Sequence, residues 1–192
     1  VIQIINLILY STTSLFISHF FTPTSVTDYS ISYRYFSIAM IIFTIIINPY
    51  WGAITNAYAK QDMSWIKQAI KKLLLIWGGL SLLVLFLLLC SSFVYKIWLG
   101  KDINIPITMG ISVSIYIIMF NLNNIFVSII NGIGKIRLQL YVSIIQLLLF
   151  LPLALSLSKI TGASGIIWAT SILLEITTIV LVWQVLKKKK KS

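Results

Sequence analysis

Charged residues are scarce in this chain, and acidic residues are the scarcest. Charged side chains make up 10% of the 192 residues, and Asp and Glu together number four. An average soluble domain carries about 25% charged residues. The chain is 59% hydrophobic and has a mean hydropathy of +0.99. Water is a poor solvent for such a surface, so the composition predicts an integral membrane protein.

The scarcity of acids and thiols also limits the chemistry that the chain can perform. The acidic residues stand far apart in the sequence, at Asp28, Asp62, Asp102 and Glu175. A metal-dependent transferase needs clustered carboxylates to hold its cation. Cys90 is the only cysteine, which excludes an internal disulfide or a multi-cysteine metal site. No glycine-rich phosphate loop with a lysine is present. We therefore expect no enzymatic activity, no cofactor and no metal site.

Long apolar runs fill the rest of the sequence. A bilayer core about 30 Å thick requires roughly 20 apolar residues in a helix. Six runs meet that length, at about 2–21, 29–58, 73–95, 106–130, 136–158 and 163–186. None alternates polar and apolar residues as a membrane barrel strand does. The prediction is an all-α polytopic membrane protein, a single six-transmembrane-helix bundle over residues 1–192.

The segment between the second and third runs has a different pattern. Over about 62–72, Trp65 and Ile66 share one helical face, while Lys67 and Lys71 point away from it. This amphipathic pattern predicts a helix lying in the membrane interface, with Asp62 as its N-cap. Pro49, inside the second run, predicts a kink in that helix.

Basic residues gather at the ends of the apolar runs. The formal net charge is +11. Because the basic residues do not spread over one face, we reject nucleic-acid binding. One side of the predicted topology holds eleven of them: Lys60, Lys67, Lys71, Lys72, Lys135, Arg137 and Lys187 to Lys191. The other side holds four: Arg34, Lys96, Lys101 and Lys159. The positive-inside rule then predicts that both ends are cytoplasmic and that the basic side contacts anionic lipids.

Polar side chains inside the runs recur at helical spacing, which places each set on one face. Amides facing hydrocarbon are costly, so these faces are expected to turn toward other helices or water. The candidates for lining a hydrated cavity are Asn48, Asn121, Asn124 and Gln146. The alternative is ordinary helix packing, since small polar residues also join membrane helices. The third run is nearly free of such residues, so we expect it outermost.

Two charged residues inside the runs carry functional hypotheses. Glu175 is near the middle of the sixth run, where a carboxylate must pair, face water or take up a proton. A role in ion coupling and a purely structural role are both open. Arg34 lies near the outer end of the second run. It either reaches back to the lipid head groups or contacts a substrate phosphate.

Several segments resemble the second half of O-antigen flippases, from the polysaccharide-exporter branch of the multidrug/oligosaccharidyl-lipid/polysaccharide exporter superfamily. The resemblance is carried, in chain order, by FISHFFTPTSVTDYSISYRYFSI (16–38), NPYWGAITNAYAKQDMSWIKQAIKKL (48–73), NGIGKIRLQ (131–139) and LSKITGASGIIWAT (157–170). It covers essentially the whole chain, though it consists of loose patterns. It implies a MATE-like architecture of two six-helix lobes, with this chain as the second lobe and a missing N-terminal lobe as its partner.

The resemblance also implies a function. Relatives move undecaprenyl-diphosphate-linked oligosaccharide across the bacterial inner membrane by alternating access, for surface polysaccharide biosynthesis. By position, Arg34 belongs to the aromatic and basic start of the second span, Asn48 and Pro49 to its kink, and Asp62 with Trp65 to the cytoplasmic linker. Two other functions stay open: a multidrug or lipid II exporter of the same superfamily, and a non-transporting membrane assembly subunit.

Overall fold

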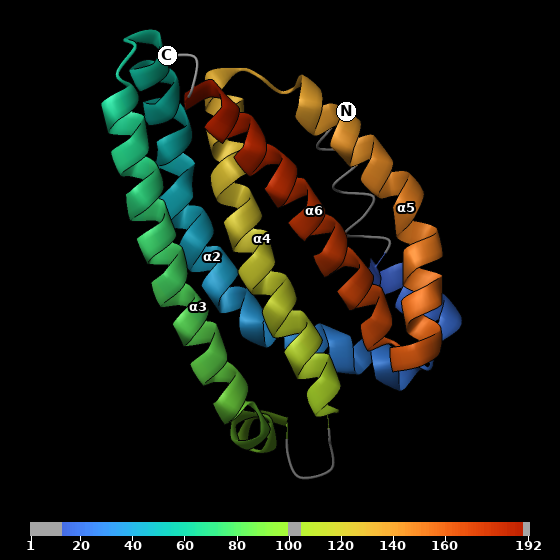
Figure 1. The fold of residues 1–192 in the computed structure, drawn as a ribbon. Coiled ribbons are helices and arrows are strands. Elements are labelled where there is room, and N and C mark those ends of the chain that lie inside the picture. Colours follow the sequence, from blue (N-terminus) through green and yellow to red (C-terminus); the bar gives the residue numbers. More distant parts are fainter. Residues whose placement is uncertain (1–12, 100–104, 190–192) are drawn as a thin grey trace.

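The computed structural model describes residues 13–99 and 105–189, and within these ranges it contains helices and no strand (Figure 1). The helices are α2 (Pro23–Ala59), α3 (Met63–Leu99), α4 (Ile107–Ile133), α5 (Arg137–Thr161) and α6 (Ser164–Lys189). Residues 13–20, which precede α2, are helical as well. All five named helices are long and apolar enough to cross a bilayer. The predicted all-α polytopic bundle is confirmed.

Local capping signals explain where the helices begin and end. The Thr22 hydroxyl accepts a hydrogen bond from the N–H of Ser25 at 3.4 Å, and Pro23 occupies the first position of α2, where its missing N–H costs nothing. After α4, Gly134 adopts a left-handed conformation with φ 75°. A residue with a Cβ is strained there, so glycine suits this stop.

The last three expected spans agree with the helices to within a few residues, but the second and third do not. The second helix begins at Pro23 rather than near residue 29. The interfacial helix expected at 62–72 does not exist separately, because α3 runs without interruption from Met63 to Leu99. No proline or glycine breaks the chain before Gly78, so the amphipathic turn and the apolar run propagate as one helix. The first span, expected at 2–21, lies mostly outside the described residues.

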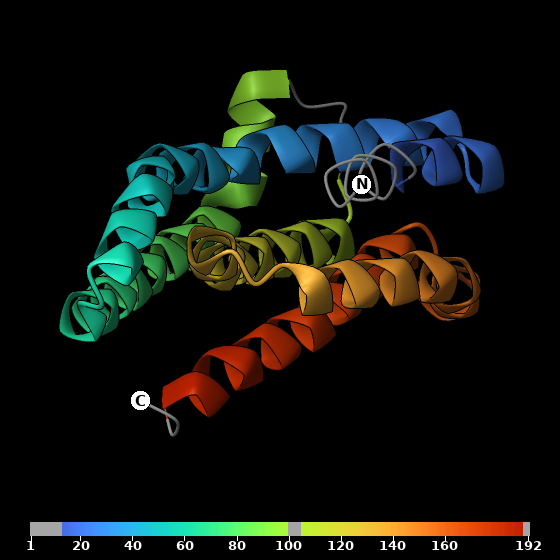
Figure 2. The ribbon, with the colours of Figure 1, turned by 90° about the horizontal axis from the view of Figure 1, so that it is seen from above.

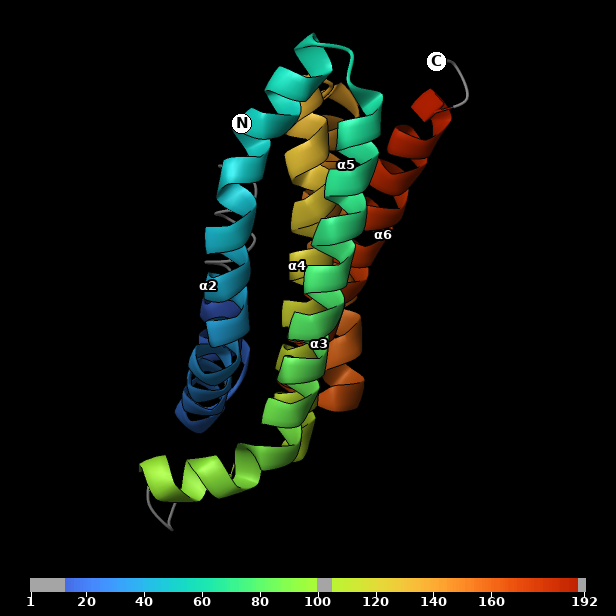
Figure 3. The same cartoon turned by 90° about the vertical axis from the view of Figure 1, so that its left-hand side faces the viewer.

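The α3 helix is longer than a single bilayer crossing requires, since it has 37 residues. At about 1.5 Å per residue its length is about 55 Å, well beyond the bilayer core of about 30 Å. Figure 3 shows that its last turns run across the direction of the rest of the helix. Phe93, Ile97 and Trp98 are exposed in this part, and Lys96 lies among them. Aromatic and basic side chains are typical of the membrane interface. The segment of α3 that resembles an interfacial helix is thus its C-terminal end. The sequence predicts such a helix at 62–72, at the N-terminal end.

The α4 helix is the centre of the bundle. It packs against α2, α3 and α6, while α5 packs against α6. Figure 2 shows α4 between α2 on one side and α6 on the other. In their most apolar windows, α4 and α6 bury 61% of their residues and α3 buries 11%. The expectation that the third run is outermost is consistent with this difference.

Close approach between α2 and α4 depends on a glycine. A Cβ at Gly132 would lie 2.7 Å from Cγ2 of Ile54, whose side chain is fully buried. The contact lies near the C-terminal ends of both helices, so α2 and α4 run parallel. The basic loop at the end of α2 and the one after α4 therefore lie at the same end of the bundle, as the charge pattern predicts (Figure 1).

Candidate functional site

The apolar core divides into two clusters along the length of the bundle. The first contains Phe36, Ile117 and Ile167, and the second contains Phe43, Ile129 and Leu181. On α4, the first cluster ends near Phe120 and the buried members of the second begin at Ile125. On α6, Leu174 is the last member of the first cluster, and Leu181 is the first buried member of the second.

Polar residues lie at the level of the bundle between the two clusters. We call this set the polar layer: Asn121, Asn123 and Asn124 on α4, Gln146 on α5, and Glu175 and Thr178 on α6. Six residues were expected to contact substrate, line a cavity or couple an ion, and four of them lie at one level of α4, α5 and α6: Asn121, Asn124, Gln146 and Glu175. The sequence shows this layer only as polar residues near the middle of apolar runs.

Two hydrogen bonds within the polar layer connect the three helices. The side-chain amide of Asn123 donates to the hydroxyl of Thr178 at 3.0 Å, joining α4 to α6. The side-chain amide of Gln146 donates to the carbonyl of Leu173 at 2.8 Å, joining α5 to α6. All three polar side chains are buried. Asn123 was missed by the sequence analysis, because the stripe chosen on α4 ran through Asn121 and Asn124 instead.

Other polar atoms near this level lack partners. Oδ1 of Asn121 and Oε2 of Glu175 are buried without a hydrogen bond to any described residue. Within the described ranges, Glu175 also forms no ion pair. A buried polar atom without a partner is costly, and an ionised carboxylate more so. These atoms mark the places in the bundle where a water molecule, a proton or a further polar group would be most favourable.

Arg34 and Asn48 are not part of the polar layer, and both lie on an exposed face of α2. Their separation along the helix is about 21 Å, at about 1.5 Å per residue. The residues of this face follow one another at alternating steps of four and three, and all of them are exposed: Arg34, Ile38, Ile41, Ile45, Asn48, Gly52 and Thr55. We call this set the α2 stripe. Pro49 is exposed beside it, and α2 continues through it; the kink expected there stays a prediction.

Asp62 and Trp65 form the turn between α2 and α3. Oδ1 of Asp62 accepts hydrogen bonds from the N–H of Trp65 at 2.9 Å and from the Ser64 hydroxyl at 2.7 Å. The Trp65 N–H, and then the Ser64 hydroxyl, stabilise the ionised form and lower the pKa of Asp62. This cap is therefore fully formed above the ordinary pKa of an aspartate and is lost as the pH falls through the lowered value. The Trp65 ring lies 6.4 Å from that of Tyr50, so the turn is also tied to α2.

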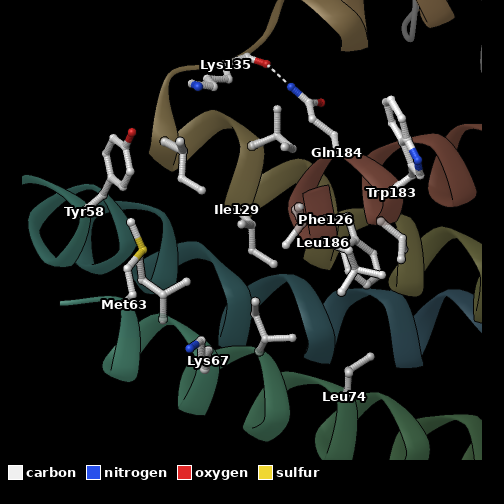
Figure 4. A pocket seen from close by; sticks show the side chains of 16 residues that line it. Tyr58, Met63, Lys67, Leu74, Phe126, Ile129, Lys135, Trp183, Gln184 and Leu186 are labelled. Carbon is white, nitrogen blue, oxygen red and sulfur yellow. Dashed lines mark hydrogen bonds between the residues drawn. The ribbon is translucent and has the colours of Figure 1, made fainter. Parts of the chain in front are cut away.

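A groove opens at the same end of the bundle as this turn (Figure 4). Its volume is about 740 Å³, and it is lined by the C-terminal ends of α2, α4 and α6 and the N-terminal part of α3. None of the residues expected to line a cavity contributes to it. Its walls are mainly apolar, and among the described residues Lys67 and Lys135 are the only charged ones that line it. The sequence analysis did not foresee this groove, because its walls come from four separate runs.

The Asn123–Thr178 hydrogen bond can be measured by a double-mutant cycle. We expect Asn123→Ala and Thr178→Val to be coupled by about 0.6 kcal/mol and at most about 1.7 kcal/mol, the range for such bonds in membranes. Thermal unfolding of the purified protein in detergent measures it. Ser128, on α4 but without a described hydrogen bond to Thr178, supplies the control pair Ser128→Ala with Thr178→Val. Strictly additive effects in the first cycle would show that the bond contributes nothing.

No protein-family model, curated protein or solved structure matches this chain. The α2 stripe, the polar layer and the groove are therefore the structural features that bear on its function.

Proposed function

We propose that this chain is one lobe of a multi-pass exporter that moves lipid-linked oligosaccharide across the bacterial inner membrane by alternating access. The α2 stripe is the observation that carries the proposal. It exposes Arg34 and Asn48 on a helix whose apolar window is long enough to span a bilayer. Lipid tails solvate neither the guanidinium of Arg34 nor the amide of Asn48. Water or a second protein lobe must therefore cover the stripe. A two-lobed exporter supplies both at its central cavity.

The chemistry of the α2 stripe suits an anionic, polyhydroxylated substrate. The guanidinium of Arg34 can donate two parallel hydrogen bonds to a phosphate. Arg34 forms no ion pair in the part of the chain that the structure describes, so its charge is free for such a contact. Asn48, which both donates and accepts, can bind sugar hydroxyls. The side chains between them on the stripe are isoleucines, which leave few other polar groups for the substrate to bind.

The polar layer joins three helices into one unit. Alternating access by rocking requires each lobe to move as a unit. The bonds from Asn123 to Thr178 and from Gln146 to Leu173 hold α4, α5 and α6 together near the middle of the bundle. The α2 helix packs more extensively on α4 than on any other described helix, so it belongs to the same unit.

Arg34→Ala is the direct test of the phosphate contact. A hydrogen bond to a charged group contributes about 1.5–3 kcal/mol, so we expect export to fall about 10- to 100-fold. Export is measured on the full-length protein in proteoliposomes, as the transfer of a lipid-diphosphate-linked oligosaccharide from one leaflet to the other. Arg34→Lys retains the charge but not the paired donors, and is expected to restore export only in part.

Arg137→Ala is the matched control, because Arg137 is exposed at the opposite end of the bundle and lies outside the α2 stripe. It should leave export unchanged. Wild-type export by Arg34→Ala would reject the phosphate contact. Export of cationic drugs with no effect on the oligosaccharide would favour the multidrug alternative, and no transport of either class would favour an assembly subunit.

A further inference from the structure

The groove at the basic end of the bundle is elongated. It extends along α3 from Met63 to Leu74 and along α4 from Phe126 to Ile133. At about 1.5 Å per helical residue, these two stretches are about 17 Å and about 10 Å long. The volume of the groove is about 740 Å³. Small-molecule sites typically have volumes between about 300 Å³ and about 1000 Å³. The groove is therefore large enough for part of a chain-like apolar molecule.

The walls that α3, α4 and α6 contribute are mainly aliphatic. Ile66 and Ile70 come from α3, Ile129 from α4 and Val182 from α6. These side chains offer no hydrogen bond, so they favour an apolar occupant over a sugar or a nucleotide. Leu74 lies at one end of the groove, toward the middle of α3, and Tyr58, Met63 and Lys135 lie at the other (Figure 4).

The polar end of the groove carries positive charge. The ammonium groups of Lys67 and Lys135 stand on different sides of the groove in Figure 4. Neither lysine forms an ion pair with a described residue, and both are exposed. Lys60, Lys71 and Lys72 add to the potential at this end of the bundle, where Asp62 is the only described acid.

Gln184 adds a neutral polar group to the groove. Its side-chain amide donates to the carbonyl of Lys135 at 3.1 Å. Its Oε1 is buried and has no hydrogen-bond partner among the described residues. A buried acceptor without a donor carries a free-energy cost, which an occupant with a hydroxyl group near its charged end would remove.

We propose that the groove binds an anionic phospholipid of the surrounding leaflet, with an acyl chain between α3 and α6 and its phosphate between Lys67 and Lys135. Phosphatidylglycerol has all three required features: apolar chains, one negative charge and headgroup hydroxyls that can donate to Gln184. Basic pockets between membrane helices bind anionic head groups in this way. The site is separate from the α2 stripe, and the proposal does not depend on the substrate that the protein moves.

Lipid retention by the full-length protein tests the site. The protein is placed in nanodiscs of equal parts phosphatidylglycerol and phosphatidylethanolamine, released into detergent, and analysed by native mass spectrometry. We expect retained phosphatidylglycerol in clear excess over phosphatidylethanolamine. Each lysine near an anionic lipid contributes about 1 kcal/mol, so Lys67→Gln and Lys135→Gln should each reduce retention about fivefold. Both lysines are exposed, so neither change disturbs the core.

The control is Lys96→Gln with Lys159→Gln, two exposed lysines at the other end of the bundle. This pair removes the same total charge and should leave retention unchanged. Three results would overturn the proposal: equal retention of the two lipids, unchanged retention after both groove lysines are removed, or no retained phospholipid at all. The last result is expected if another segment of the protein or a second copy fills the groove.

Discussion

Gly165→Ala is expected to destabilise the protein by about 3 kcal/mol, the upper range for overpacking a tight contact. A Cβ at this position would lie 2.5 Å from the backbone C and O of Leu157 and from the N of Ser158. These are backbone atoms of the preceding helix, which cannot rotate away as a side chain can. The first turn of α6 would therefore have to separate from the end of α5, and the packing of these two helices would be lost. The midpoint of thermal unfolding in detergent measures the effect.

Gly79→Ala is the matched control for this prediction. Gly79 is exposed in the middle of α3, and a Cβ there would meet no atom within 4 Å. Because alanine is the better helix former by about 1 kcal/mol, this change should raise the unfolding midpoint or leave it unchanged. If both variants unfolded at the wild-type temperature, the close contact between Gly165 and the backbone of α5 would be contradicted.

Glu175→Gln is expected to stabilise the protein and, if the proposed transport function holds, to lower export, because an ionisable group within a membrane helix is costly and is usually retained for function. The stability gain follows from the buried Oε2, which has no described partner, because a neutral amide is less costly to hold there than a carboxylate. Under the proposed transport function, the export loss follows from its place in the polar layer on α6, at the level of the α4 asparagines. Export measured across a range of pH, together with the unfolding midpoint, checks both parts.

Glu175→Asp separates ion coupling from packing, since it retains the carboxylate on a shorter side chain. A coupling role predicts that Glu175→Asp keeps a pH-dependent export and that Glu175→Gln loses the dependence. An identical pH profile for Glu175→Gln and the wild type would remove Glu175 from any proton pathway. The stability gain alone would then remain, and the carboxylate would have a purely structural role.

The positions of the helices could be predicted from the sequence because hydrocarbon imposes a length and a composition on each span. Pro106 marks the start of α4 in the sequence and in the structure, whereas α4 continues past its expected end near residue 130 to Ile133 and stops at Gly134. The beginning of α3 was less predictable. The lysine-rich turn at 62–72 has the pattern of an interfacial helix, but the sequence contains no residue that stops a helix between it and the apolar run.

The candidate site was predictable only at the level of single faces. Periodicity identified Asn121, Gln146 and Glu175 as polar residues turned away from lipid, and all three are buried or half-buried. It could not distinguish the amide that bonds to a neighbouring helix from the ones beside it, since that choice depends on the rotation of α4 against α6. For the same reason Asn48 and Asn121, which look alike in sequence, are exposed and buried respectively.

The order of synthesis gives the polar layer a consequence for biogenesis. Three asparagines of the polar layer enter the bilayer with α4, but Thr178, the hydrogen-bond partner of Asn123, belongs to α6 and emerges from the ribosome only after α5 has been inserted. Until then the amide faces lipid or the insertion machinery. Nascent chains that end before α6 should accordingly be held by membrane chaperones and degraded quickly, whereas chains that include Thr178 should become resistant to proteolysis.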